Sequence, residues 1–208
     1  MEIAAICGSS RQNGTTDMLV NQIIEGLDAD KIFLRDYHVT PVLDCRHSDS
    51  LPSYPDDDYR DLLTRILNKD IVIFATPIYW YGMSGLMKHF IDRWSQTLLE
   101  KGRDDFKRQM SGKTAYVIAV GDDEPHLKGL PLIQQFQYIF DFMEMTFGGY
   151  LIGKGNRPGS IANDSAAVFS ANGLKQKGRG NHDKRNREQS IRAMEKTFFR
   201  DRQGFHLI

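Results

Sequence analysis

The chain has 208 residues, and its 27 basic side chains balance its 27 acidic ones. A neutral chain of this length suits one domain with its own core, and its charge gives no reason to expect a nucleic acid, an anionic membrane or a polyanionic substrate. No apolar run approaches the ~18 residues of a membrane span, and no basic segment precedes the first apolar run. We therefore expect a cytoplasmic protein.

The candidate metal ligands are few and badly spaced. Cys7 lies in an apolar run and Cys45 in a polar segment, so the two form neither a Cys-x-x-Cys pair nor a disulfide framework. The acids Asp122, Asp123 and Glu124 have no histidine or further acid nearby at ligand spacing, which favours a solvated turn. We expect reduced thiols and no metal site.

Short β-branched runs alternate with amphipathic segments along the first 152 residues. Strands are predicted at 3–7, 70–75 and 114–120, with weaker candidates at 31–34 and 150–152. This alternation predicts an α/β fold with a parallel sheet, right-handed crossovers and helices on both faces. The helical spacing is carried by Leu19, Ile23 and Leu27, by Tyr59, Leu62 and Ile66, by Leu86, Phe90, Trp94 and Leu98, and by Leu130, Ile133, Phe136, Phe140 and Met143.

The loop after the first strand, residues 8–16, reads Gly-Ser-Ser-Arg-Gln-Asn-Gly-Thr-Thr and leads into a helix predicted at 18–27. Hydroxyls, glycines and backbone N–H groups at a helix N-terminus suit a phosphate or another anion. The alternative without a ligand is an ordinary turn with Thr16 or Asp17 as the N-cap. The candidate donors are Ser9, Ser10, Thr15 and Thr16, with a charge from Arg11 and tight turns at Gly8 and Gly14.

Two other nucleotide loops do not fit these residues. A P-loop fails because Gly14 lies one residue too far from Gly8 and Thr15 stands where lysine is required. The dinucleotide fingerprint fails because Ser10 and Asn13 occupy the places of its second and third glycines.

The third strand leads into a second informative loop, residues 76–85, with the sequence Thr-Pro-Ile-Tyr-Trp-Tyr-Gly-Met-Ser-Gly. Its three consecutive aromatics would be exposed unless a planar ligand, a second subunit or another loop covered them. The alternative is that they form ordinary core or dimer contacts. Pro77 restricts the backbone, Gly82 permits close approach of a ligand, and Ser84 is the predicted N-cap of the next helix.

Together, the two loops make the sequence resemble the NADPH-dependent FMN reductase family of flavodoxin-like proteins. The similarity covers roughly the first 150 residues. It implies a flavodoxin-like three-layer sandwich around a five-stranded parallel sheet of order 2-1-3-4-5. The matching residues are Gly8, Ser9, Ser10 and Arg11 with Gly14 and Thr16, then residues 77–85 followed by Lys88, Phe90, Ile91, Asp92 and Arg93.

The resemblance also implies a flavin site. In the family, the first loop holds the FMN phosphate and the second lies against the isoalloxazine ring. If FMN is bound in this way, we expect the loop after the fourth strand to approach the ring from its other side. The implied phosphate contacts are Ser9, Ser10, Arg11, Asn13, Gly14, Thr15 and Thr16, and the implied ring contacts are Pro77, Ile78, Tyr79, Trp80, Tyr81 and Gly82, with Gly121 and Asp122.

The activity implied by the resemblance is that of an FMN-dependent NAD(P)H oxidoreductase. Hydride passes from NAD(P)H to N5 of FMN, and a quinone, a nitro or azo compound, a metal ion or a flavin is then reduced. No catalytic side chain is needed because the flavin performs the chemistry. The alternatives are a flavodoxin-like electron carrier and a flavin-free interaction module. The neutral charge and the aromatic loop favour the enzyme, since flavodoxins are typically acidic.

Some relatives in the resemblance are iron–sulfur flavoproteins with a cysteine cluster after the second strand. Cys45 alone cannot supply the four thiolates of such a cluster, so we expect none. The resemblance further suggests a homodimer or homotetramer in which Asp92 and Arg93 form interface ion pairs, with a solvated helix face as the alternative.

The basic end of the chain is predicted to be an appendage of the flavin domain. Residues 1–153 are predicted to form that domain, and 154–208 a basic loop plus a helix. This extension is interpreted either as part of the same domain or as an oligomerisation arm, with a lid over the NADPH 2′-phosphate as an alternative. We favour the arm because Ile191, Met194, Phe198 and Phe199 suggest an apolar helical face.

Overall fold

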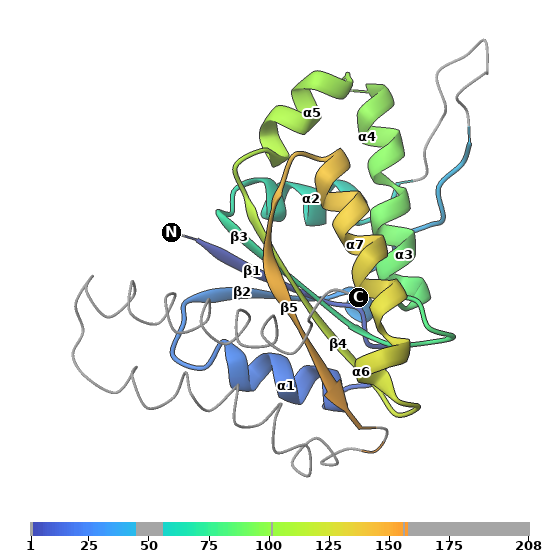
Figure 1. The fold of residues 1–208 in the computed structure, drawn as a ribbon. Helices are drawn as coiled ribbons and strands as arrows, with labels where there is room; N and C mark the ends of the chain where they lie inside the picture. Colours follow the sequence, from blue (N-terminus) through green and yellow to red (C-terminus); the bar gives the residue numbers. More distant parts are fainter. Residues whose placement is uncertain (1, 45–55, 101, 156, 158–208) are drawn as a thin grey trace.

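A parallel sheet of five strands in the order β2-β1-β3-β4-β5 forms the centre of the computed structural model, which describes residues 2–44, 56–100, 102–155 and 157 (Figure 1). The predicted fold class and strand order are therefore confirmed. The extension at 154–208 lies almost wholly outside the described residues. The strands are β1 Ile3–Cys7, β2 Ala29–Phe33, β3 Ile71–Pro77, β4 Thr114–Gly121 and β5 Thr146–Lys154. The helices are α1 Thr15–Ile23, η1 Leu34–Asp36 (a 3₁₀ turn), α2 Tyr59–Leu67, α3 Gly85–Asp92, α4 Trp94–Glu100, α5 Arg103–Met110, α6 Pro125–Lys128 and α7 Leu130–Phe142.

Side chains on the two faces of the sheet enter separate hydrophobic clusters. One face, including Phe74 and Val117, packs against apolar residues of α2, α3, α4, α5 and α7. The other face, including Ala5 and Ile73, packs against α1. Because strand residues alternate between the faces, strands buried on both sides read as continuous apolar runs. This explains why the three central strands were found from the sequence.

Several strand ends differ from their predictions, and the differences are largest in β3 and β5. Thr76 and Pro77 belong to β3, where they align with Ala119 and Val120 of β4. The predicted strand at 150–152 is only part of β5, which starts earlier and has a register shift opposite Ala115 and Tyr116. Glycines in a strand weaken its sequence signal. Here Gly148 is needed, because a Cβ on it would lie 2.5 Å from the Tyr116 ring.

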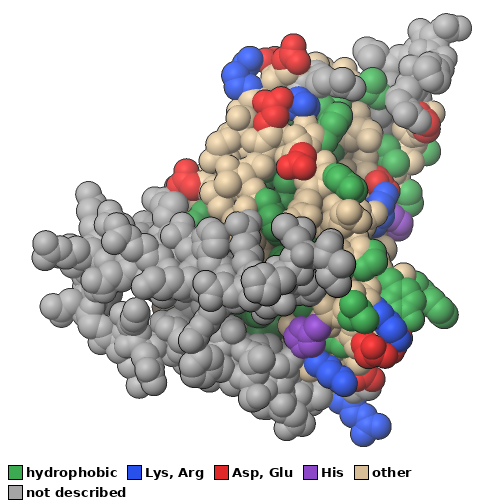
Figure 2. Space-filling view, viewed as in Figure 1, with side chains coloured by type: hydrophobic (Ala, Val, Ile, Leu, Met, Phe, Trp, Pro, Cys, Tyr) green, Lys and Arg blue, Asp and Glu red, His purple; other side chains and the backbone are tan. Residues whose placement is uncertain are grey.

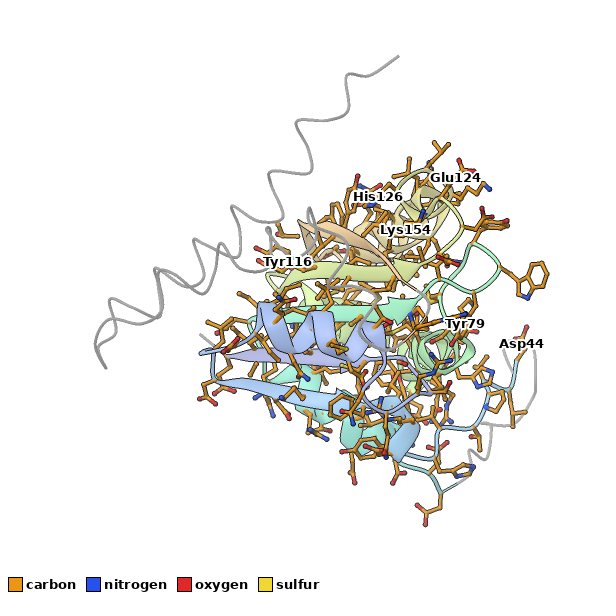
Figure 3. The ribbon with its side chains drawn as sticks, turned by 90° about the horizontal axis from the view of Figure 1, so that it is seen from below. Asp44, Tyr79, Tyr116, Glu124, His126 and Lys154 are labelled. Carbon is orange, nitrogen blue, oxygen red and sulfur yellow. The ribbon has the colours of Figure 1, made fainter. Side chains whose placement is uncertain are left out.

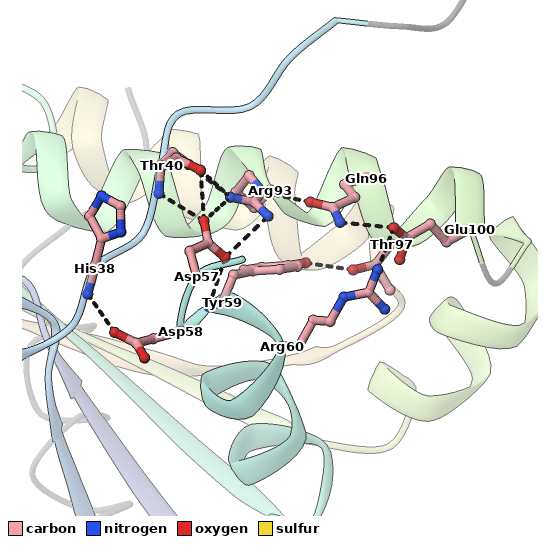
Figure 4. A network of polar contacts seen from close by, with 10 residues as sticks. All are labelled: His38, Thr40, Asp57, Asp58, Tyr59, Arg60, Arg93, Gln96, Thr97 and Glu100. Carbon is pink, nitrogen blue, oxygen red and sulfur yellow. Dashed lines mark hydrogen bonds and ion pairs between the residues drawn. The ribbon is translucent and has the colours of Figure 1, made fainter. Parts of the chain in front are cut away.

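The predicted helix through Leu86 and Leu98 is divided at Arg93 into α3 and α4. Arg93 and Asp57 form an ion pair with an N–O distance of 2.5 Å, and both side chains are 1% exposed. Arg93 also donates to the Thr40 carbonyl and hydroxyl and to Gln96 Oε1 (Figure 4). The expectation that Arg93 lies at a subunit interface or on a solvated face is wrong, because the side chain is buried within its own chain.

Breaking the Arg93–Asp57 pair should strongly destabilise the fold. Burial disfavours the charged form of Asp57, but hydrogen bonds from Arg93, Thr40 and the Tyr59 N–H outweigh it and hold its pKa at about 2. The stability gained from this shift is therefore present above the usual carboxyl pKa of ~3.9 and lost as the pH falls through about 2. We expect Asp57→Asn to lower the free energy of unfolding at neutral pH by ~3–5 kcal/mol, because Arg93 stays buried without its partner.

Urea denaturation at a series of pH values tests this expectation. The variant should lose less stability than the wild type between about pH 4 and pH 2. Asp105→Asn is the control, because Asp105 pairs with Arg108 at the surface and such pairs contribute up to ~1 kcal/mol. An unchanged pH dependence in Asp57→Asn would contradict the assignment.

Candidate functional site

Three loops meet at the carboxyl edge of the sheet, because parallel strands all end on one side. They follow β1, β3 and β4. Figure 3 shows Tyr79 of the second loop and Glu124 of the third at this edge, whereas Tyr116, near the start of β4, lies toward the opposite edge. The predicted site residues are therefore brought to one end of the molecule.

The loop after β1 is shaped by its own hydrogen bonds. The Gly8 N–H donates to the Ala75 carbonyl at 2.8 Å, which keeps the start of the loop beside β3. Ser9 is buried; its hydroxyl donates to the Arg11 carbonyl at 3.2 Å and accepts from the Arg11 N–H at 3.3 Å. Asn13 has a φ of 53°, in the left-handed region that asparagine tolerates. The Ser9 hydroxyl thus serves the loop conformation.

Helix α1 begins at Thr15, with Gly14 as a glycine N-cap that provides no side-chain acceptor. The alternative N-caps, Thr16 and Asp17, are wrong because both lie within the first turn. The first N–H groups of a helix have no intrahelical acceptor and carry the positive end of the helix dipole. The Thr15 hydroxyl donates to the Arg157 carbonyl at 3.1 Å, so the chain beyond β5 reaches this turn. This arrangement suits an anion.

Arg35, a residue that sequence reasoning missed, contacts the same loop from η1. Its Nη1 donates to the carbonyls of Ser9 and Arg11 at 3.1 and 3.2 Å and lies 2.9 Å from Asp17 Oδ2. Asp17 is 2% exposed, and burial raises its pKa although the charge of Arg35 opposes the shift. No spacing rule connects Arg35 with the first loop, so the sequence carries no signal for this contact.

The loop after β3 carries a tight turn of two aromatic residues. The N–H and carbonyl of Tyr79 bond those of Gly82 at 3.0 Å each, and between them Trp80 and Tyr81 have φ angles of 49° and 63°. Left-handed backbone at bulky residues costs on the order of 1–3 kcal/mol and is concentrated at functional sites. Trp80 is 96% exposed, and hydrophobic side chains project on this side of the molecule in Figure 2.

Ser84 joins the first and second loops. Its hydroxyl donates to the Gly8 carbonyl at 2.6 Å and accepts from the Met87 N–H, which confirms it as the N-cap of α3. Its own N–H donates to the Thr76 hydroxyl at 2.9 Å. A Cβ on Gly8 would lie 2.8 Å from the Ser84 hydroxyl, so this close approach requires glycine.

The loop after β4 contacts the aromatic turn. A Cβ on Gly121 would lie 3.1 Å from Ile78, and the Tyr81 hydroxyl donates to Asp123 at 3.0 Å. Lys128 donates to the other oxygen of Asp123 at 2.7 Å. The hydrogen bond from Lys128 and, to a lesser extent, that from Tyr81 lower the pKa of the Asp123 carboxyl. The three acids at 122–124 are exposed, as expected for a solvated turn.

The described ranges contain neither a metal-binding cluster nor a membrane-spanning helix. No group of three or more histidine, cysteine, aspartate or glutamate side chains there is placed to hold a metal ion. Across the same residues, every helix is too short or too polar to cross a bilayer. Cys45 lies outside the described residues, so the absence of an iron–sulfur cluster stays a prediction.

The family model of the NADPH-dependent FMN reductases matches residues 1–152. The chain therefore belongs to this family of enzymes. It is 53% identical over 174 residues to YwqN of Bacillus subtilis, named as an NAD(P)H-dependent FMN-containing oxidoreductase, covering 84% of this chain and 96% of that one. It is 28% identical to the iron-sulfur flavoprotein MJ1083 of Methanocaldococcus jannaschii, covering 85% and 95%. The solved structure of the Trp repressor binding protein from Bacillus subtilis has 47% identity and a TM-score of 0.69, covering 88% and 100%.

The family assignment confirms the predicted class of enzyme, an FMN-dependent NAD(P)H oxidoreductase with a flavodoxin-like fold. FMN and NAD(P)H are accordingly the cofactor and the co-substrate of the class.

Removing the Ser84 hydroxyl should loosen the connection between the first two loops. Ser84→Ala loses the N-cap of α3 and leaves the buried Gly8 carbonyl without this donor. We expect the free energy of unfolding to fall by ~1–2 kcal/mol, measured by urea denaturation. Ser95→Ala, at an exposed position of α4, should change it by less than ~0.5 kcal/mol. Equal stability of the two variants would show that this connection contributes nothing.

Proposed function

We propose that the chain binds FMN across the three loops at the carboxyl edge of the sheet and uses NAD(P)H to reduce a small acceptor. One observation carries this proposal: Ser84 joins the first loop, which leads into an α1 N-terminus without a side-chain cap, to the loop that holds an exposed turn of aromatic residues. The positive helix end suits a phosphate, and aromatic side chains suit a planar ring. The residues present therefore fit the two halves of FMN.

The phosphate is proposed to bind the N–H groups of the 8–16 loop and of the first turn of α1. Ser10 and Thr16 are the hydroxyl donors, because Ser9 and Thr15 already bond the backbone of Arg11 and Arg157. Ser9 then contributes by shaping the loop. Arg11, Asn13 and Gly14 complete the proposed phosphate contacts.

The flavin ring is proposed to lie against the loop after β3, with the loop after β4 beside it. FMN, when bound, supplies the redox chemistry between NAD(P)H and the acceptor. The protein orients the ring and limits water, and no catalytic side chain is required. The turn of Trp80 and Tyr81 is braced by Asp123, which fixes one wall of the site. The proposed ring contacts are Pro77, Ile78, Tyr79, Trp80, Tyr81, Gly82, Gly121 and Asp122.

The acceptor is proposed to be a small molecule such as a quinone, a nitro or azo compound, a metal ion or a free flavin. Exposed aromatic faces beside the flavin favour planar acceptors, because such surfaces stack on rings. We also propose a cytoplasmic homodimer or homotetramer. The buried free thiol of Cys7 fits a reducing compartment, and a partner subunit covering Trp80 would bury an otherwise exposed ring.

Anaerobic reduction of the purified full chain tests the function. We expect yellow protein that NADPH or NADH bleaches and that selected acceptors reoxidise. Yellow protein that neither nucleotide bleaches would exclude the NAD(P)H-dependent activity and favour a flavodoxin-like electron carrier. Colourless protein that does not bind added FMN would exclude both flavin functions. Sedimentation of the same preparation tests the oligomeric state.

The phosphate assignment predicts a selective effect of Thr16→Ala. Loss of one neutral hydrogen bond should weaken FMN binding by ~0.5–1.5 kcal/mol in a fluorescence titration and leave riboflavin binding unchanged. Thr64→Ala, an exposed threonine of α2 whose hydroxyl bonds the Arg60 carbonyl, is the matched control. Unchanged FMN affinity in Thr16→Ala would mean that this hydroxyl does not contact the phosphate.

A further inference from the structure

We infer that Arg35, paired with Asp17 beneath the first loop, holds that loop in its phosphate-binding conformation and sets the preference of the site for FMN over riboflavin. The inference rests on the proposed function, and Arg35 acts in it as a positioning residue. It is carried by three contacts of one guanidinium nitrogen, two with loop carbonyls and one with a buried carboxylate.

The two carbonyl contacts determine which way the loop peptides face. The carbonyls of Ser9 and Arg11 both point at Arg35 Nη1. In a trans peptide the carbonyl and the following N–H point in opposite directions. The N–H groups of Ser10 and Gln12 are therefore turned away from Arg35, toward the open side of the loop where both residues are exposed. Successive N–H groups facing one side form the kind of concavity that binds anions.

Arg35 is the main charged partner of Asp17. Arg35 Nη1 lies 2.9 Å from Asp17 Oδ2, and the contacts of Asp17 with Arg35 and the Asn13 N–H favour its charged form, although burial outweighs them and raises its pKa. Asp17 is in the first turn of α1, so its negative charge lies close to the proposed phosphate. Without Arg35 this buried charge would repel the phosphate.

Few other charges contribute at this position. Asp36 Oδ1 lies 3.9 Å from Arg35 Nε, but its side chain is 53% exposed and therefore well screened. On the sheet side, the Cys7 thiol is buried and its pKa is raised to about 12, chiefly by burial and next by Asp17, so the thiol is neutral. The guanidinium carbon lies 4.4 Å from the centre of the Phe33 ring, which restrains its position. Arg35 is thus the cation among these neighbours that offsets Asp17.

A double-mutant cycle at Asp17 and Arg35 tests the inference. The affinities of the full chain for FMN and for riboflavin are measured in each variant. Arg35→Met should raise the Kd for FMN by ~10-fold or more, because charged hydrogen bonds are lost and Asp17 stays unpaired. The Kd for riboflavin should change by less than ~3-fold, because riboflavin has no phosphate to repel. Asp17→Asn should bind FMN at least as tightly as the wild type. The double variant Asp17→Asn with Arg35→Met should recover at least ~3-fold of the lost affinity.

Arg65→Met is the matched control. Arg65 forms a more exposed ion pair with Asp30, and its other hydrogen bonds go to Tyr37 and Lys31, outside the three loops. Both flavin affinities should therefore stay at wild-type values. If Arg35→Met does not fold, Arg35→Lys, which keeps the charge, should give an intermediate FMN affinity. Equal weakening of FMN and riboflavin, or no recovery in the double variant, would overturn the role of Arg35. A wild-type protein that binds neither flavin would instead overturn the proposed function.

Discussion

The hydrogen bond from the Ser84 hydroxyl to the Gly8 carbonyl is the contact on which the site depends. It joins the end of β1 to the start of α3, while the N–H of Ser84 reaches back to Thr76 in β3. A parallel sheet brings strand ends to one edge but does not fix the loops that follow them. This serine fixes two such loops relative to each other. The absence of a side chain on Gly8 makes the approach sterically possible.

The second constraint is the strained turn at Trp80 and Tyr81. A glycine at either place would adopt the same backbone at lower cost, so local stability does not explain two aromatics there. The surrounding contacts hold the turn from both ends, through the Tyr79–Gly82 bonds and through the Tyr81–Asp123 bond. The stability of the sheet compensates for the local backbone strain of this turn. The turn in return exposes aromatic ring surface at the carboxyl edge of the sheet.

The sequence predicted what depends on local patterns. The central strands were evident from their apolar runs, and Ser84 as an N-cap followed from residue type and position. Long-range partners leave no such signal. Nothing near Arg93 indicates that it is buried with Asp57, and nothing near Arg35 indicates a contact with Ser9. The sequence does not predict the start of β5, because Gly148 has low strand propensity. The reason for glycine at this position is its contact with the Tyr116 ring on the neighbouring strand, which leaves no room for a side chain.

Two ion pairs that each contain a buried carboxylate show why net charge says little about this protein. Arg93 and Asp57 are both surrounded by further hydrogen-bond partners, as in a pair that fixes one packing arrangement. In the second pair, burial outweighs the contacts of Asp17 with Arg35 and the Asn13 N–H, so the pKa of Asp17 is raised and the ionised form is less well stabilised. Arg35 divides its contacts between Asp17 and two carbonyls of the loop that follows β1. The first pair is therefore suited to fixing the packing of the core, and the second to holding the adjacent loop in one conformation.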